Sequence, residues 1–148
     1  MADFAFRDSD NFYYAVDVKT HRLDTHFNMP NLISVNRLAQ FYEVDTNYFV
    51  LLIVKYSLDA LTLQVRQVHF VPIEFLSWDC LTIGALGWGQ LQIVDANQII
   101  INPSPRKAWM LTLCAKLLEF YSNQTETINT RIAHFEQIKR HWLDKADA

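Results

Sequence analysis

Apolar and aromatic residues in the first part of the chain fall into short runs separated by polar turns. Residues 4–6 are apolar, residues 7–11 are polar and typical of a turn, and residues 12–19 are rich in aromatic and β-branched side chains. This pattern predicts two strands joined as a hairpin.

Two further apolar runs predict a pair of longer strands. Residues 48–56 are almost continuously apolar, which is typical of a strand buried on both faces. Residues 63–70 alternate between apolar and polar side chains, but the alternation breaks at Gln67, so the register of this strand stays open. Between the hairpin and these strands, residues 32–43 predict a short helix.

The last third of the chain has helical periodicity. Ser104 can cap a helix, and Pro105 suits a first helical position. Apolar residues at helical spacing then predict one helix with Met110, Leu113, Cys114, Leu117, Leu118 and Tyr121 on its inner stripe, and a second with Ile128, Ile132, Phe135, Ile138 and Trp142. Strands followed by helices predict a single α/β or α+β domain over residues 1–148.

Composition and charge narrow the class of protein. The 148 residues carry a formal net charge of -3, which argues against nucleic-acid binding through net charge and leaves room for a local basic cleft. With 20% charged and 14% aromatic residues, the chain is not disordered. The sequence has neither a visible signal peptide nor an apolar run of membrane-spanning length, so we expect a cytoplasmic protein. Cys80 and Cys114 are expected to be buried thiols.

All three glycines, Gly84, Gly87 and Gly89, fall within six positions. The flanking triplets 81–83 and 91–93 each read apolar-polar-apolar, which predicts a hairpin with a glycine-containing loop. The order of the glycines matches neither a dinucleotide-binding turn nor a P-loop. Two interpretations stay open.

In the first interpretation of this loop, Trp88 packs on the core. In the second, the loop approaches DNA. Gln90 or Gln92 would then offer amide groups to base edges, and Trp88 would contact a sugar or a base.

Asp3, Asp17 and Lys19 form the strongest candidate site. Residues i and i+2 of a strand share a face, so Asp17 and Lys19 project together, and a hairpin would bring Asp3 close to Asp17. Two carboxylates can hold Mg²⁺, and a lysine beside them can position water and stabilise negative charge during phosphodiester hydrolysis. The alternative is a surface ion pair.

Polar side chains surround this candidate site in the sequence. Thr20, His21 and Arg22 follow it directly, as expected at the lip of a binding cleft, and Asn36 and Arg37 are further candidates for phosphate contacts. His21 and His26 are either a metal-binding pair or ordinary hydrogen-bonded histidines.

The segment Ala2-Asp3-Phe4-Ala5-Phe6, followed after ten residues by Asp17-Val18-Lys19-Thr20, resembles the PD-(D/E)XK nuclease motif. It is most similar to that of type II restriction endonucleases of the EcoRV kind. The resemblance implies a restriction-endonuclease-like central mixed sheet flanked by helices, and Mg²⁺-dependent, site-specific cleavage of double-stranded DNA by a homodimer. It assigns Asp3 and Asp17 to the metal and makes Lys19 the catalytic lysine.

The chain departs from the family pattern in two places. Ala2 stands where the motif has proline, and the motif begins at residue 3, where family members have an N-terminal helix before it. We therefore expect the chain to lack an N-terminal helical segment. Two alternatives follow: a catalytically inactive DNA-binding or interaction remnant of such a nuclease, or a subunit whose apolar excess marks a partner surface.

Overall fold

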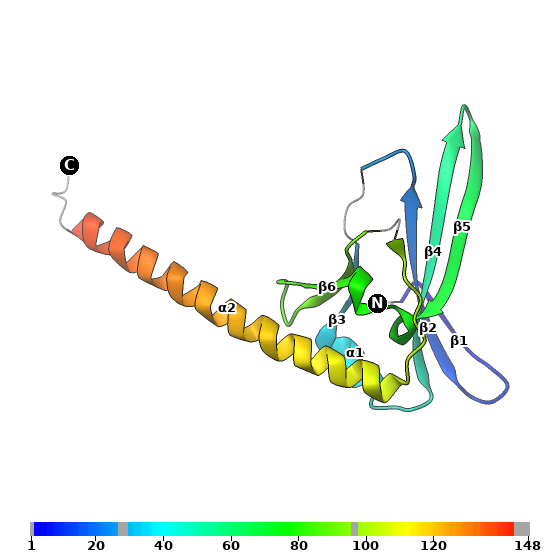
Figure 1. Cartoon of the computed structure of the whole chain (residues 1–148), viewed down its shortest axis with the longest axis horizontal. Coiled ribbons are helices and arrows are strands. Elements are labelled where there is room, and N and C mark those ends of the chain that lie inside the picture. Colours follow the sequence, from blue (N-terminus) through cyan, green and yellow to red (C-terminus); the bar gives the residue numbers. More distant parts are fainter. Residues whose placement is uncertain (1, 27–29, 96–97, 144–148) are drawn as a thin grey trace. The chain divides into compact units, whose positions relative to one another are not determined.

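A computed structural model describes residues 2–26, 30–95 and 98–143. The chain forms two compact units, Met1–Arg106 and Lys107–Ala148. The first unit contains all the strands, and the second consists of a long helix (Figure 1).

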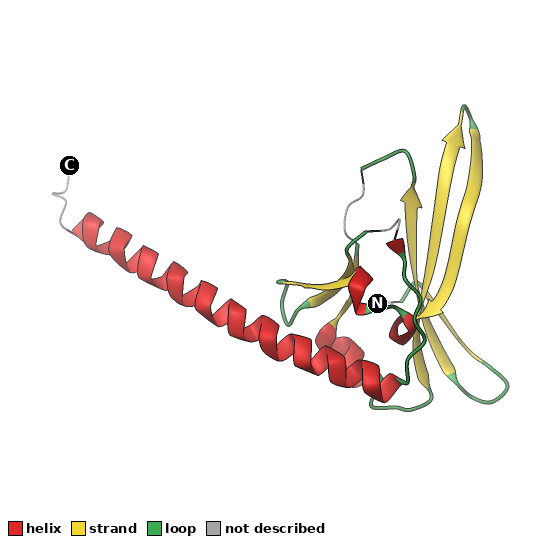
Figure 2. Cartoon of the chain, in the orientation of Figure 1, coloured by secondary structure: helices red, strands yellow, loops and turns green. Residues whose placement is uncertain are grey.

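A four-stranded mixed sheet dominates the first unit (Figure 2). Its strands are, in spatial order, β1 (Phe4–Arg7), β2 (Tyr13–Arg22), β4 (Asn47–Asp59) and β5 (Thr62–Pro72). The β1–β2 and β4–β5 pairs are antiparallel, whereas β2 and β4 run parallel. The predicted hairpin and the predicted α/β class are therefore confirmed.

The connection from β2 to β4 contains both a strand and a helix. β3 (Asn31–Ser34) comes first, and α1 (Val35–Phe41) follows it directly. The prediction of a helix over residues 32–43 is therefore correct only for its second part. Pairing of β3 with a distant strand extends the backbone there, so a tertiary contact outweighs the local helical pattern.

A second, three-stranded sheet has the order β3-β7-β6. β6 (Leu81–Gly84) and β7 (Gln90–Ile93) are antiparallel and enclose the glycine-containing loop, which confirms the predicted hairpin. Two short 3-10 helices, η1 (Ile73–Phe75) and η2 (Trp78–Cys80), lead from β5 into this sheet. Cys80 is buried, as expected.

A β-bulge explains the broken alternation in β5. Lys55 pairs with Gln67, but Tyr56 pairs with Val65, so Arg66 is the extra residue. The bulge restores the phase of the strand. As a result, four apolar side chains lie on one face of the sheet: Leu63, Val65, Val68 and Phe70.

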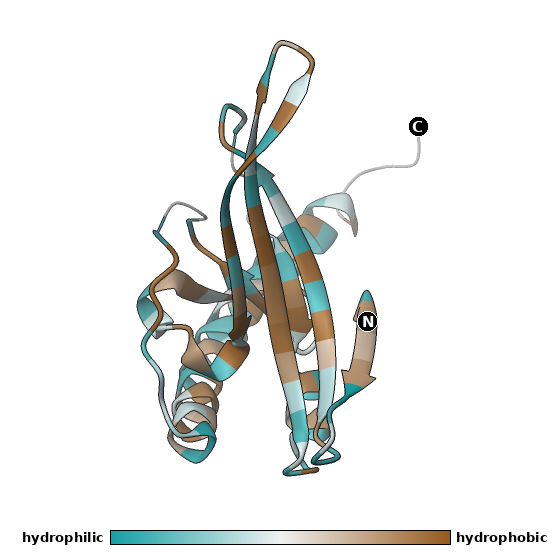
Figure 3. Cartoon of the chain, turned by 90° about the vertical axis from the view of Figure 1, so that its right-hand side faces the viewer, coloured by the Kyte–Doolittle hydropathy of each residue, from teal (hydrophilic) through white to brown (hydrophobic). Residues whose placement is uncertain are grey.

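The two faces of the four-stranded sheet have different environments. Phe49, Leu51 and Ile53 of β4 point to the inner face and are buried, together with core residues from α1 and β7. The outer face carries apolar side chains that are mostly half-buried or exposed, including the four of β5. Figure 3 shows the hydrophobic residues along the strands of this sheet. The prediction that β4 is buried on both faces is thus confirmed for the inner face, whereas on the outer face Val50 is buried and Tyr48, Leu52 and Val54 are half-buried.

The described part of the second unit is one helix, α2 (Arg106–Leu143), whose first residue ends the first unit, so the prediction of two helices is wrong. The polar segment 122–127 suggests a break, but it contains neither glycine nor proline. Its hydroxyl groups bond back to the helix instead: Ser122 donates to the Leu118 carbonyl at 2.9 Å and Thr125 to the Tyr121 carbonyl at 3.0 Å.

Two smaller predictions about α2 also need correction. The helix begins at Arg106, so Pro105 precedes it and is not its first residue. Cys114 is exposed on the helix surface, and the prediction that this thiol is buried is wrong.

Candidate functional site

The β1–β2 hairpin brings Asp3 and Asp17 together. Phe4 pairs with Val16, so the register places Asp3, one residue earlier, opposite Asp17. Two hydrogen bonds fix this position: the Asp3 amide donates to the Val16 carbonyl at 2.9 Å, and the Val18 amide donates to Asp3 Oδ2 at 2.6 Å. The exposed Asp3 therefore stands at the sheet end next to the buried Asp17.

Asp17 and Lys19 form an ion pair on the inner face of β2. Lys19 Nζ lies 3.1 Å from Asp17 Oδ1 and 2.9 Å from Oδ2. Asp17 is only 4% exposed. Burial raises the pKa of Asp17 above its usual value, Lys19 partly offsets this rise, and the negative charge of Asp3 adds to it. The predicted trio is thus assembled at one place.

The donor set of this site suits a hard divalent cation. Asp17 Oδ2 is buried and lies 2.9 Å from Lys19 Nζ, its ion-pair partner. Carboxylate oxygens are ligands that Mg²⁺ takes, and Asp3 can supply a second carboxylate. Within the described residues, His, Cys, Asp and Glu side chains form no cluster of three or more that could hold a metal. Protein ligation would therefore come from the two aspartates.

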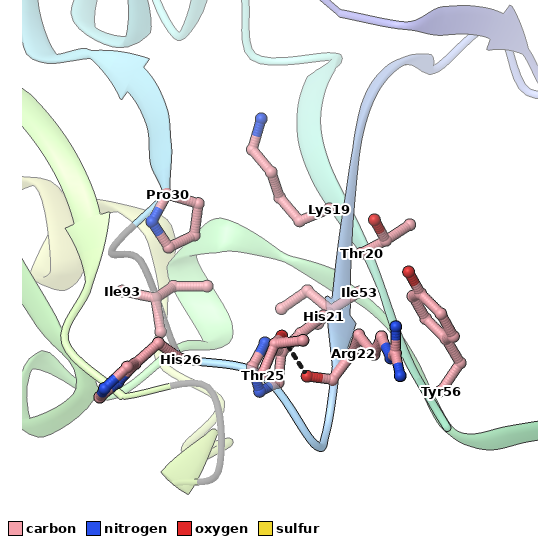
Figure 4. Close-up of a pocket in the computed structure, with 10 residues that line it drawn as sticks. All are labelled: Lys19, Thr20, His21, Arg22, Thr25, His26, Pro30, Ile53, Tyr56 and Ile93. Carbon is pink, nitrogen blue, oxygen red and sulfur yellow. Dashed lines mark hydrogen bonds between the residues drawn. The ribbon is translucent and has the colours of Figure 1, made fainter. Parts of the chain in front are cut away.

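A basic cavity of about 340 Å³ adjoins Lys19 (Figure 4). Its wall is formed by Lys19, Thr20, His21, Arg22, Thr25, His26, Pro30, Ile53, Tyr56 and Ile93. Four of these residues are basic or imidazole side chains, and the lining contains no carboxylate. The Arg22 guanidinium is held by Asp24 through two hydrogen bonds of 2.7 and 2.6 Å. The predicted lip of Thr20, His21 and Arg22 therefore lines a polar cavity whose two cationic side chains, Lys19 and Arg22, are each paired with an aspartate.

Lys55 and His69 also belong to the inner face, and sequence reasoning missed both. Lys55 lies beside His21 in the parallel β2–β4 register, and His69 is opposite Ile53 on β5. Lys55 is 4% exposed, and burial lowers its pKa, an effect that Asp95 partly offsets. Burial and the charge of Lys55 lower the pKa of His69. The sequence feature that could have indicated Lys55 is its place as a lone lysine within the apolar run 48–56.

The other predicted DNA contacts lie apart from this cavity. Asn36 and Arg37 are on α1, and Arg37 lines a different cavity. Gln92 donates to Asn31 Oδ1 at 2.7 Å, which ties its side chain to β3. Gln90 pairs with Gly84 in the β6–β7 hairpin.

The tip of this hairpin is exposed. Trp88 is 67% exposed, so the interpretation in which it packs on the core is wrong. The other interpretation, an approach of the loop to DNA, stays a prediction.

No model of a known protein family matches the chain, and no curated protein matches it. Within the described residues, none of the helices combines the length and the apolar character needed to cross a membrane.

Proposed function

We propose that this chain is a Mg²⁺-dependent, site-specific endonuclease that hydrolyses phosphodiester bonds of double-stranded DNA, with the restriction-endonuclease-like fold. One observation carries the proposal: the buried Asp17 is ion-paired with Lys19, and the hairpin register sets Asp3 opposite it. An ordinary surface ion pair is exposed to solvent, whereas Asp17 is only 4% exposed. The mixed sheet supports the proposed fold.

Asp3 and Asp17 would hold the Mg²⁺ ion. When bound, the ion polarises a phosphoryl oxygen and lowers the pKa of water. Asp17 keeps Lys19 in place through the ion pair, and the ammonium stands ready to orient a water molecule and to stabilise the negative charge that develops on the phosphate. The rigid backbone of β2 fixes both side chains, which lowers the entropic cost of bringing them to the substrate.

The cavity beside Lys19 supports binding of the DNA backbone. Its lining offers the imidazoles of His21 and His26 together with two cationic side chains, Lys19 and Arg22, whose charges Asp17 and Asp24 partly neutralise. Such groups contact phosphate oxygens and set the position of the duplex without reading its sequence. Sequence discrimination would fall to the β6–β7 loop, where Gln90 is the predicted contact to base edges.

Cleavage of supercoiled plasmid in the presence of Mg²⁺ tests the proposal. Asp17→Asn and Lys19→Met should each lower the cleavage rate by about 100-fold or more, because each removes a group that acts on the transition state. Asp59→Asn and Lys107→Met are matched controls at exposed positions and should cleave normally. Undiminished cleavage by both site variants, with their folds verified by circular dichroism, would contradict the assignment.

One observation favours a second function, an inactive DNA-binding or interaction remnant of such a nuclease. The Asp3 carboxylate is already engaged by the Val18 amide, so it is less available to a metal. Titration calorimetry with Mg²⁺ separates the two functions. An active site binds the ion, and Asp17→Asn abolishes that binding. A remnant binds DNA equally well with and without Mg²⁺ and does not cleave it.

A further inference from the structure

Helix α2 carries a regular heptad pattern along most of its length. Residues spaced alternately by three and four positions form a line that we call the heptad seam. The first set of positions, a, contains Leu111, Leu118, Thr125, Ile132 and Lys139, and the second, d, contains Cys114, Tyr121, Ile128, Phe135 and Trp142. Such a pattern sustained over more than four heptads is typical of a coiled coil.

The apolar side chains of the heptad seam face solvent. Leu118 is 71% exposed and Phe135 is 66% exposed, and the other large apolar members are exposed as well. At a rise of about 1.5 Å per residue, the seam from Leu111 to Trp142 is roughly 48 Å long. An isolated helix gains most of its stability from packing of its apolar face, so this stripe requires a partner of the same length.

The residues beside the seam are complementary to a second copy of the same helix. Heptad position g directly precedes a, and position e directly follows d. In a parallel, in-register pair, each g position faces the e position five residues later in the other helix. Arg131 at g then meets Glu136 at e, and this opposite-charge contact occurs twice by symmetry. The remaining pairs are also compatible, being Met110 with Ala115, Leu117 with Ser122, Gln124 with Asn129, and Ile138 with Leu143.

Two polar residues in the seam indicate a two-stranded assembly. Thr125 and Lys139 both occupy heptad position a. Polar residues at heptad position a reduce the stability of a coiled coil, but they specify its register and its number of strands. The long side chain of Lys139 can reach solvent from a two-stranded interface, whereas the core of a three-stranded bundle would bury its ammonium at high cost.

We infer that α2 associates with α2 of a second copy of this chain as a parallel, in-register, two-stranded coiled coil along the heptad seam. The inference rests on α2 alone and is independent of the proposed nuclease activity. Association and DNA cleavage are measured separately, so the failure of one does not imply the failure of the other.

Sedimentation equilibrium of the full chain at micromolar concentration tests the association. The expected mass is twice the 17.3 kDa of one chain. Replacing two exposed seam residues, Ile128→Asp with Ile132→Asp, should raise the dimer dissociation constant at least about 100-fold, because it places charges in the apolar interface. Thr130→Glu with Gln137→Glu adds two charges on the opposite side of the helix and should leave the dimer intact. A monomeric wild type, a trimer, or equal effects of the two double variants would overturn the inference.

Charge exchange tests the parallel register. Arg131→Glu puts two acidic side chains opposite each other and should weaken the dimer, and Glu136→Arg should do the same with two basic ones. Combining both substitutions restores opposite charges in the parallel arrangement, so the double variant should dimerise like the wild type. A double variant weaker than either single variant would contradict the g-to-e pairing.

The native thiol gives a second test of the orientation. Cys114 is an exposed, free cysteine at a d position, so a parallel pair sets it against its own copy. With diamide as oxidant, the two thiols lose two protons and two electrons and form one disulfide between the chains. Cys114→Ser combined with Asn123→Cys moves the thiol away from the seam and should cross-link much more slowly. Equal cross-linking rates would overturn the parallel arrangement.

Discussion

Arg106 and Glu74 form an ion pair between two segments 32 residues apart, with Arg106 Nε donating to Glu74 Oε1 at 3.2 Å. The guanidinium also lies over the rings of Tyr42 and Tyr48, at 4.3 and 4.4 Å from their centroids. The Tyr42 hydroxyl donates to Glu74 Oε2 at 2.5 Å, so the buried carboxylate is satisfied from two sides. Arg106 therefore anchors the end of the first unit through charge, hydrogen bonding and stacking.

Arg106→Met should lower the free energy of unfolding by about 3 kcal/mol, because it leaves the buried Glu74 carboxylate without its cation. Arg106→Lys should cost less, since it keeps the charge and loses the stacking and the fixed donor geometry. Chemical denaturation measures both. Arg140→Met, on the exposed end of α2, is the control and should change stability by less than about 0.5 kcal/mol. An equally small effect of Arg106→Met would contradict this account.

Two glycines of the β6–β7 loop should differ in how much stability is lost when each is replaced by alanine. Gly89 has φ +104° and an added Cβ would lie 3.0 Å from Ile83 Cγ2, whereas Gly87 has φ +60° and open space around it. Gly89→Ala should therefore cost about 2–3 kcal/mol of stability, and Gly87→Ala about 1 kcal/mol, the usual cost of a left-handed conformation. Thermal unfolding of the two variants checks the order, and a reversed order would refute the strain argument.

Much of the strand layout could be predicted because it depends on neighbours in sequence. The β1–β2 and β6–β7 hairpins follow from turn residues between strand-like segments, and the proximity of Asp3 to Asp17 follows from the first of them. The phase change around Gln67 also has a local cause, the bulge at Arg66. Local patterns of this kind set both the elements and the predicted trio of the candidate site.

The rest of the site depends on contacts between distant segments. The inner-face position of Lys55 beside His21 results from parallel pairing of β2 with β4, which a crossover separates in the chain. The pairing of β3 with β7 likewise converts part of a predicted helix into a strand. Serine and threonine hydroxyl groups usually favour an interruption of a helix. In α2 the hydroxyls of Ser122 and Thr125 form hydrogen bonds with the helix backbone instead, so the polarity of this segment did not predict that the helix continues through it.

Lys55→Met should increase stability at pH 7. Burial lowers the pKa of Lys55, so between that lowered value and about 10.5 the unfolded chain binds more protons than the folded one. The penalty from the buried charge is thus complete below this window and disappears as the pH rises through it. If the lysine serves DNA binding, the variant should also bind DNA more weakly, which fluorescence anisotropy measures. Lys107→Met, which removes an exposed charge, should change neither property.

Asp17→Asn should also increase stability at neutral pH while it abolishes the proposed activity. Burial raises the pKa of Asp17, so between about 3.8 and the raised value the folded chain binds more protons than the unfolded one. Stability of the wild type therefore falls as the pH rises through this window. The amide has no such titration, so the difference in unfolding free energy between variant and wild type should be largest above the window and shrink toward low pH.

Urea denaturation of both proteins across a pH series checks this dependence on Asp17. Asp59→Asn is the matched control, since it makes the same substitution at an exposed carboxylate on the β4 end of the β4–β5 hairpin. A variant less stable than the wild type at every pH would mean that the Lys19 ion pair outweighs the cost of burying the carboxylate. A residue that is kept for function at a cost in stability should give a more stable fold when it is replaced. A less stable Asp17→Asn variant would therefore show that Asp17 is not such a residue.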